Sequence, residues 1–264
     1  GLGDVYKRQV HGFQTEVTKL LGLLAKSLYS NKEVFLRELV SNASDAVDKL
    51  RFLSLTKPEL TADDPIFSIR IKADPEAGTL SVIDNGIGMT LAEANEHLGT
   101  IAKSGTEAFM AQLTGEEKKD SQLIGQFGVG FYSAFMVADK LTVISKAYGS
   151  DEAWQWESSG VDGYEMTPAQ KDTVGTQIIL HIKPDTDTEK YDNFLDEYGI
   201  VAIVKKYSDY VRYPIQMERE KSRQKPEPDP KPEDYKPEWE TYTELETLNL
   251  SLIHISEPTR HAQI

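Results

Sequence analysis

Two stretches near the start of the chain repeat hydrophobic residues at the spacing of an amphipathic helix. The first covers residues 14–28 and the second runs from Ser30 to about Leu53, because apolar residues recur every three or four positions. Ser30 and Glu33 are spaced as in a capping box, which marks a helix start. We therefore expect a long second helix that opens with this box and has a polar side flanked by an apolar stripe.

Further along, the chain alternates between strand and helix patterns. Thr90 followed by Glu93 predicts a second capping box, for a short helix that ends near Leu98. Helical periodicity returns over 188–211. Alternating apolar and polar positions predict strands over 66–73, 79–83, 141–147, 153–158, 163–167 and 175–182. Helices, then strands, then helices predict an α+β protein, built as a two-layer sandwich.

Two segments break these patterns. Residues 99–130 contain many glycines and charged residues and few core positions, so we expect a mobile loop region around a short helix from Ser104. Over 218–238 the chain turns to charged residues and prolines, which predicts a solvated linker. The expected organisation is a main domain over 10–217, this linker, and a further segment over 239–249.

Composition restricts the class of protein without naming a function. The 264 residues carry 29 Lys and Arg against 43 Asp and Glu, a net charge of −14, which argues against a general binder of nucleic-acid backbone. The chain has no cysteine, so disulfides, a thiolate nucleophile and a sulfur-liganded zinc site are excluded. No hydrophobic run approaches the ~20 residues that span a bilayer.

The two ends of the chain are related at the level of DNA. Codons that encode Asp4–Gln9 have a reverse complement that encodes Leu250–Ile255, and this DNA resembles a transposon-end adapter used to prepare sequencing libraries. We therefore expect residues 1–9 and 250–264 to be non-native, and the native protein to continue beyond Asn249. The alternative is a flexible native tail at each end.

The polar side of the second helix is the first candidate site. Glu38, Asn42 and Asp45 fall within about 60° of one another around the helix axis. They are flanked by the apolar stripe and do not lie opposite it. The alternative is an ordinary solvated face, because acidic residues at this spacing are common on helices.

Two glycine-containing motifs are the other candidates. Asp84–Met89 directly follows a strand, where an aspartate before two glycines can place a carboxylate in a pocket floor beside bare backbone. Such a carboxylate suits an exocyclic amine such as the N6 of adenine. Gly125–Gly130 precedes the helical segment 131–137, where uncovered N–H groups can hold an anion; it is neither a Rossmann nor a P-loop fingerprint. The alternatives are a tight turn for the first motif and a flexible hinge for the second.

Together these segments resemble a known family. The 90-kilodalton heat-shock chaperones have similar signatures in the same order as Asn31–Ala46, Asp84–Met89, Leu98–Gly105 and Gly125–Ser133. His97 and the short linker resemble the bacterial members. The resemblance implies the Bergerat fold of the GHKL ATPases, with a mixed, mostly antiparallel sheet covered by helices. It also implies a nucleotide domain that ends near residue 217 and a truncated middle domain that starts at 239–249.

The resemblance implies a role for each candidate residue. Asp84 would bind the adenine amine, with Thr176 helping through ordered water, and Asn42 would offer its carbonyl oxygen to Mg²⁺. Glu38 would orient and deprotonate the attacking water, and Arg37 would order the polar network. Further nucleotide contacts are expected from Asp45, Gly88, Met89, Leu98, Lys103, Gly125, Gln126, Phe127, Gly128, Val129, Gly130 and Phe131.

The resemblance also implies what the parent protein does. It would bind ATP or ADP with Mg²⁺, hydrolyse ATP, and remodel client proteins in the cytoplasm as a homodimer whose lid, over 99–130, closes on the nucleotide. Neither nucleic acid nor a membrane is an expected partner. A second function class remains, because the family needs a middle-domain arginine and dimerisation for efficient turnover: a nucleotide-binding module that hydrolyses little by itself.

Overall fold

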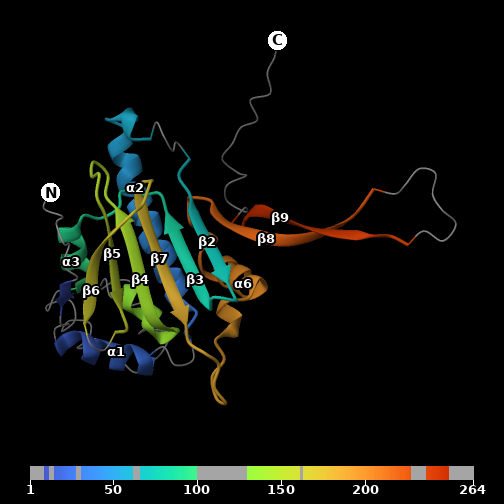
Figure 1. The fold of residues 1–264 in the computed structure, drawn as a ribbon, viewed down its shortest axis with the longest axis horizontal. Coiled ribbons are helices and arrows are strands. Elements are labelled where there is room, and N and C mark those ends of the chain that lie inside the picture. Colours follow the sequence, from blue (N-terminus) through green and yellow to red (C-terminus); the bar gives the residue numbers. More distant parts are fainter. Residues whose placement is uncertain are drawn as a thin grey trace, which may run out of the picture.

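A nine-stranded sheet organises the described part of the chain, and helices pack on one of its faces (Figure 1). The structure is a computed structural model that describes residues 9–11, 15–27, 31–61, 66–99, 130–160, 163–226 and 236–249. Its elements are β1 (Gln9–His11), α1 (Thr15–Ser27), α2 (Val34–Ser54), the 3₁₀ helix η1 (Pro58–Thr61), β2 (Ile69–Asp74), β3 (Thr79–Asp84), α3 (Leu91–Gly99), η2 (Gly130–Met136), β4 (Ala138–Lys146), β5 (Ala153–Ser158), β6 (Tyr164–Ala169), β7 (Gly175–Ile182), η3 (Asp192–Phe194), α6 (Glu197–Tyr207), β8 (Ile215–Gln224) and β9 (Trp239–Thr247).

The sheet has the strand order β1-β6-β5-β4-β7-β3-β2-β8-β9. Every neighbouring pair is antiparallel except β2 and β8, which run parallel. The prediction of an α+β protein with a mixed, mostly antiparallel sheet covered by helices is confirmed. None of the helices among the described residues is long and apolar enough to cross a bilayer.

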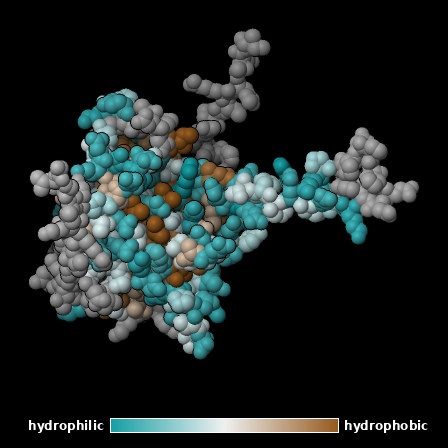
Figure 2. Space-filling view, viewed as in Figure 1, coloured by the Kyte–Doolittle hydropathy of each residue, from teal (hydrophilic) through white to brown (hydrophobic). Residues whose placement is uncertain are grey.

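The core lies between α2 and the middle of the sheet. Leu39, Val40 and Val47 of α2 are fully buried, as are Leu80 of β3 and Leu180 of β7. Each fully buried aliphatic side chain contributes ~1.5–3 kcal/mol. Among the described residues, no helix covers the opposite face of the sheet. This face is seen from the front in Figures 1 and 2, where hydrophobic patches lie among polar residues.

The second predicted capping box is confirmed, whereas α2 begins later than the first predicted box requires. Before α3, the Thr90 N–H donates to Glu93 Oε2 at 2.7 Å, and the Glu93 N–H donates to Thr90 Oγ1 at 3.3 Å. By contrast, α2 begins at Val34, and Glu33 at its N-cap makes no side-chain cap hydrogen bond. Ser30 lies outside the described residues.

Contacts to α6 explain why the residues before α2 do not cap it. Lys206 Nζ donates to Glu33 Oε2 at 2.9 Å, and the Tyr207 hydroxyl donates to Asn31 Oδ1 at 3.1 Å. Lys32 pairs with Glu189 at 2.5 Å. These polar side chains therefore join α2 to the segment 189–207, and tertiary contacts replace the expected local cap.

Several predicted boundaries shift for local reasons. The predicted strand 66–73 starts at Ile69, because Asn85 accepts from the Ser68 N–H at 2.9 Å and donates to the Ile66 carbonyl at 2.5 Å. The helical pattern over 188–211 resolves into η3 and the shorter α6. Asp196 caps α6 by accepting from the Gly199 N–H at 2.8 Å.

The expectation of a solvated linker over 218–238 is wrong up to Gln224. These residues extend β8, and β9 returns alongside them as an antiparallel partner. The two strands project from the body beyond β2, and we call this projection the arm (Figure 1). Charged residues and prolines together predict a linker here, because the pairing of β8 cations with β9 carboxylates appears only when the strand register is known.

Some predictions fall on residues that the structure does not describe. These are most of the proposed lid, over 100–129, and the terminal strings 1–8 and 250–264. Gln9, by contrast, belongs to β1 and pairs with Met166 of β6. The lid, the non-native ends and the domain boundaries remain predictions.

Candidate functional site

A cavity of about 510 Å³ opens between α2, the segment after β3, α3 and the core face of β7. We call it the α2 cavity. Its walls combine apolar side chains with carboxylates, amides and hydroxyls, as small-molecule sites usually do. The lining residues are Asn42, Ala43, Asp45, Ala46, Lys49, Val82, Asp84, Ile87, Gly88, Met89, Thr90, Glu93, His97, Leu98, Phe131, Ala147, Tyr148, Thr176 and Ile178.

A polar row crosses three neighbouring strands at the floor of this cavity. Asp84 of β3 stands opposite Thr176 of β7, and Thr176 stands opposite Ser145 of β4. The hydroxyls of Ser145 and Thr176 are 2.9 Å apart and share a hydrogen bond. All three side chains are buried, so the floor presents fixed polar groups within an otherwise apolar core.

Burial dominates the electrostatics of Asp84. Its carboxylate accepts from the Gly86 N–H at 2.9 Å and from the Thr176 backbone. Loss of solvation raises the pKa of Asp84 from 3.8 to about 7, although these two hydrogen bonds and the Lys171 charge oppose the rise. Asp84 is therefore an acceptor whose charge changes near neutral pH.

The two glycines after Asp84 let the backbone approach its neighbours closely. A side chain at Gly86 would collide with the Ala46 backbone of α2, and one at Gly88 would collide with the Lys146 carbonyl. Gly88 also has a φ of +66°, which L side chains rarely adopt. The Ile87 N–H donates to the Ala46 carbonyl at 3.0 Å. The motif is thus more than a tight turn, because it docks on α2 and forms one cavity wall.

Two residues that support this wall from behind have no motif in the sequence. The Met89 N–H donates to Ser145 Oγ at 3.0 Å, and Trp154 Nε1 donates to the Met89 carbonyl at 2.6 Å. Together they fix the backbone of a residue predicted to contact the base. Ser145 and Trp154 appear in the sequence only as strand positions, and their role depends on which strands are neighbours.

The polar side of α2 divides into two parts. Asn42 and Asp45 line the cavity, whereas Glu38 is not among its lining residues in the described part of the chain. Partial burial and the nearby Asp48 raise the pKa of Asp45. The structure therefore brings Asn42 and Asp45 together with Asp84, and Glu38 lies one turn away, outside the cavity lining among the described residues.

Two neighbouring residues, Arg37 and Gly130, cover the Glu38 carboxylate. Its buried side chain accepts from Arg37 Nε at 2.9 Å and from Arg37 Nη2 at 2.6 Å. Gly130 packs so closely against this carboxylate that any side chain there would collide with it. The prediction that Arg37 orders the polar network has a direct structural counterpart in this ion pair.

Apolar residues complete the wall near α3 and η2. Leu98 and Phe131 line the cavity, and the Tyr132 hydroxyl donates to the Leu98 carbonyl at 2.5 Å. The Phe131 ring meets Trp156 edge to face, with centroids 5.6 Å apart. These contacts hold the end of α3 against η2 and give a flat ligand an apolar surface.

The remaining predicted nucleotide contacts cannot be placed. Lys103, Gly125, Gln126, Phe127, Gly128 and Val129 lie outside the described residues. Within the described ranges, no three His, Cys, Asp or Glu side chains gather to hold a metal ion. Asn42 thus offers a single amide oxygen, which fits Mg²⁺ only where phosphates and water supply the other ligands.

Comparisons with known proteins agree with this geometry. Residues 29–177 match the family described as histidine kinase-, DNA gyrase B-, and HSP90-like ATPase. Over 206 residues the chain is 55% identical to the chaperone protein HtpG of Bacillus subtilis strain 168, which covers 78% of this chain and 33% of that protein. The HtpG proteins of Clostridium acetobutylicum and Chromobacterium violaceum are 51% and 53% identical over 91% and 81% of this chain, and 37% and 33% of their own lengths.

The chain thus spans about a third of the length of these relatives. The family match covers α2, the β3 motif and the strand that carries Thr176, which are the elements that build the α2 cavity. The resemblance to the 90-kilodalton heat-shock chaperones is confirmed, and the chain belongs to the histidine kinase-, DNA gyrase B- and HSP90-like ATPases.

Proposed function

We propose that the α2 cavity binds ATP and ADP together with Mg²⁺. The single observation that supports this most is Asp84, a buried carboxylate in the floor of a cavity large enough for a nucleoside. An ionised carboxylate accepts a hydrogen bond from the adenine amine, whereas guanine presents a carbonyl oxygen at the equivalent position. Such a charge-assisted bond contributes ~1.5–3 kcal/mol and selects adenine.

Other residues of the cavity have complementary tasks. Thr176, joined to Ser145, can hold ordered water beside the base, and Met89, Leu98 and Phe131 can cover its faces. Asn42 would hold Mg²⁺ through its side-chain oxygen, and the ion would neutralise phosphate charge when bound. Asp45 would orient water near that ion.

For hydrolysis, we propose that Glu38 takes the proton of the attacking water. An ionised carboxylate suits this task because it can accept a proton from water. Arg37 would keep Glu38 oriented until the terminal phosphate is near. In this proposal Lys103 and the amides of residues 125–130 contact the phosphates as the lid closes.

A specific observation also favours the second candidate function, a nucleotide-binding module with little hydrolysis of its own. Glu38 is screened by Arg37 and Gly130 and is absent from the cavity lining among the described residues. Binding could therefore proceed in this chain while the base is held away from the phosphate. Hydrolysis would then need a rearrangement near Gly130.

We further propose that the parent protein is a cytoplasmic chaperone that remodels client proteins as a homodimer. The support is the similarity to HtpG chaperones over most of this chain. Client binding, the dimer clamp and the lid cycle belong to this proposal, with neither nucleic acid nor a membrane as a partner.

Calorimetric titration of the 264-residue chain with ADP, with and without Mg²⁺, tests the site directly. We expect binding that strengthens with Mg²⁺ and that Asp84→Asn weakens by about 10- to 100-fold, because the amide presents a donor toward the adenine amine. Asp139→Asn, on an exposed position of β4, is the matched control. Unchanged affinity in Asp84→Asn, or equal affinity for GDP, would overturn the proposal.

A further inference from the structure

β2 and β8 start as neighbours and then separate. They pair in parallel only over Ile69–Ile71 and Ile215–Met217, after which β8 leaves with β9 as the arm. The opening has a volume of about 300 Å³. We call it the wedge. Its lining residues are Arg70, Ile71, Lys72 and Ala73 of β2, Ile83 of β3, Glu197 of α6, Gln216, Glu218 and Glu220 of β8, and Thr243 and Leu245 of β9.

Both sides of the wedge carry backbone groups that the sheet does not use. Alternate residues of a strand direct their N–H and C=O groups to opposite sides. The Ile69 N–H points toward β8 and donates to the Pro214 carbonyl at 3.0 Å. The backbone N–H and C=O of Ala73, four residues later, therefore also point toward β8. Ile215 accepts from the β9 side, from the Leu248 N–H at 2.8 Å, so Glu218 and Glu220 face β2. The pairing of β2 with β8 ends before Ala73 and Glu220.

The side chains of β8 are unequally neutralised on its two faces. Arg219, Lys221 and Arg223 each pair with a β9 glutamate, at 3.1, 2.6 and 2.7 Å. On the other face Glu218 and Glu220 are exposed, and neither has a Lys or Arg within ion-pair distance in the described ranges.

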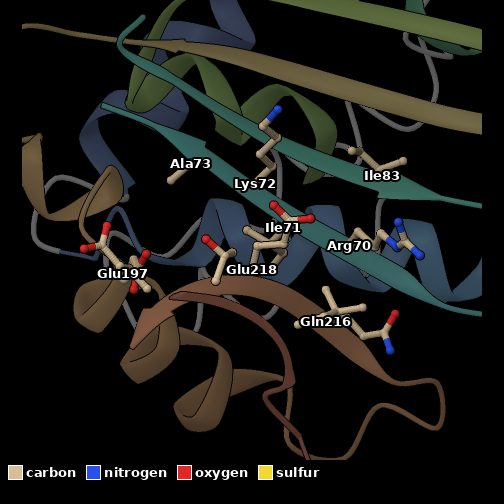
Figure 3. A pocket seen from close by; sticks show the side chains of 11 residues that line it. Arg70, Ile71, Lys72, Ala73, Ile83, Glu197, Gln216 and Glu218 are labelled. Atoms are coloured by element: carbon tan, nitrogen blue, oxygen red, sulfur yellow. The ribbon is translucent and has the colours of Figure 1, made fainter. Parts of the chain in front are cut away.

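A third carboxylate strengthens the acidic character of the wedge. Glu197, at the start of α6, lines the opening, and its ion pair with Arg219 is long, at 3.6 Å. Figure 3 shows Glu197 and Glu218 toward one end of the opening and Arg70 and Gln216 toward the other. Glu218 and Glu220 make the β8 side acidic, while Lys72 and Arg70 lie on the β2 side.

We propose that the wedge binds an extended, basic segment of another polypeptide chain by strand addition. The segment pairs its backbone with Ala73 on one side and with Glu220 on the other, which satisfies two open sheet edges at once. Its Lys or Arg side chains lie beside Glu218, Glu220 and Glu197. A small molecule would not use two facing rows of backbone groups. The lining carries three carboxylates, Glu197, Glu218 and Glu220, against the two cations Arg70 and Lys72, so its charge favours a basic segment over an acidic one.

This site is separate from the nucleotide site. No residue that lines the wedge also lines the α2 cavity, and the wedge lies where the arm leaves the sheet. The proposal therefore does not rest on the proposed function. A chain that failed to bind ADP could still bind a basic strand here, and the reverse also holds.

A labelled peptide of alternating lysine and valine is the probe, titrated against the whole chain by fluorescence anisotropy. We expect Glu218→Lys/Glu220→Lys to weaken binding about tenfold or more, a change of ~1.4 kcal/mol. The matched control is Asp151→Lys/Glu152→Lys, which makes the same charge change at exposed residues between β4 and β5. This control alters the net charge by the same amount but away from the wedge, so it should change the affinity by less than about twofold.

Two further measurements distinguish strand addition from general attraction. A peptide of alternating lysine and proline has the same charge but lacks the N–H groups of a strand, and we expect it not to bind. In amide hydrogen-exchange measurements, the N–H groups of Ala73 and Glu220 should exchange with solvent more slowly when the lysine–valine peptide is bound. Equal loss in both double variants, equal binding of the proline peptide, or unchanged exchange at both amides would each overturn the proposal.

Discussion

The α2 cavity and the arm place charged residues in opposite surroundings. In the cavity, Asp84 is buried and its pKa is raised to about 7 by lost solvation. Along the arm, exposed cations and carboxylates alternate across β8 and β9, and a hydrogen bond from Lys221 to Glu244 raises the pKa of Lys221. One region uses few polar groups at high energetic cost, whereas the other uses many at low cost.

This difference means that the cavity is suited to discriminate between ligands, whereas the surface charges of the arm do not suffice to hold it on the body of the protein. A buried carboxylate distinguishes ligands because an unsatisfied partner inside the protein is costly. Exposed ion pairs contribute little each and weaken with salt, so the arm needs another anchor. That anchor is at its base, where Leu248 and Asn249 are buried against the body of the protein.

The largest expected effect comes from the chemistry next to the cavity. We expect Glu38→Ala to lower the single-turnover rate of phosphate release by about 10²- to 10⁴-fold, the usual contribution of a general base. ADP affinity should stay within about twofold, because Glu38 does not line the cavity in the described part of the chain. Glu59→Ala, at an exposed position of η1, is the control.

Three results of that experiment would be informative. A variant with the wild-type rate contradicts the role of Glu38. A variant that loses ADP binding shows that the Arg37–Glu38 pair supports the cavity itself. A wild-type chain without measurable hydrolysis, but with tight ADP binding, supports the second candidate function.

The next effect tests the anchor of the arm. Asn249 accepts from the Ile215 N–H at 2.8 Å and donates to the carbonyls of Val211 and Tyr213 at 2.9 and 2.8 Å. Asn249→Ala leaves a buried N–H without its acceptor, so we expect the free energy of unfolding to fall by about 2–4 kcal/mol in urea titrations. Asn193→Ala, at an exposed residue of η3, should change it by less than about 0.5 kcal/mol. An equally small change for both would show that the arm is held elsewhere.

The sequence predicted the cavity better than the arm, for a physical reason. The cavity residues lie in two local patterns, the polar side of one helix and a motif that directly follows a strand. Local spacing fixed the positions of Asn42 and Asp45, and the glycines after Asp84 indicated bare backbone. Each of these signals is contained in a few consecutive residues.

What the sequence did not predict depends on strand register. Ser145 and Trp154 reach Met89 only because β4 and β5 are neighbours of the right strands. The cations Arg219, Lys221 and Arg223 have partners only once β9 lies opposite them. Likewise the residues before α2 were read as a cap, and contacts with α6 decided otherwise. Long-range pairing, unlike helix periodicity, leaves no signal in a single segment.

The pH dependence of binding gives a smaller effect that sharpens the contrast. Asp84 must be ionised to accept the adenine amine, and with a pKa of about 7 it is mostly ionised at pH 8 and mostly protonated at pH 6. We expect affinity for adenosine to fall about tenfold between these pH values. Adenosine is the probe because it carries no phosphate that titrates there. His97→Gln is a control for another lining residue and should keep the dependence, while a flat profile in the wild type would contradict a raised Asp84 pKa.

The smallest expected effect concerns salt and the arm. At ~1 M salt the screening length is ~3 Å, so the cross-strand pairs of Lys221 with Glu244 and of Arg223 with Glu240 weaken. Exposed pairs of this kind are weak, and we expect the amides of Lys221 and Arg223 to exchange only about two- to fivefold faster. The Arg223 guanidinium, whose central carbon lies 5.0 Å from the Tyr242 ring centroid, keeps some of its contact. Amides beside Asp84 and Thr176 should not change, because burial already separates that floor from the solvent ions. If amide exchange accelerated equally in both regions, salt would be acting on the whole fold. The cavity floor would then be no better protected from salt than the arm, and the contrast between the two regions would fail.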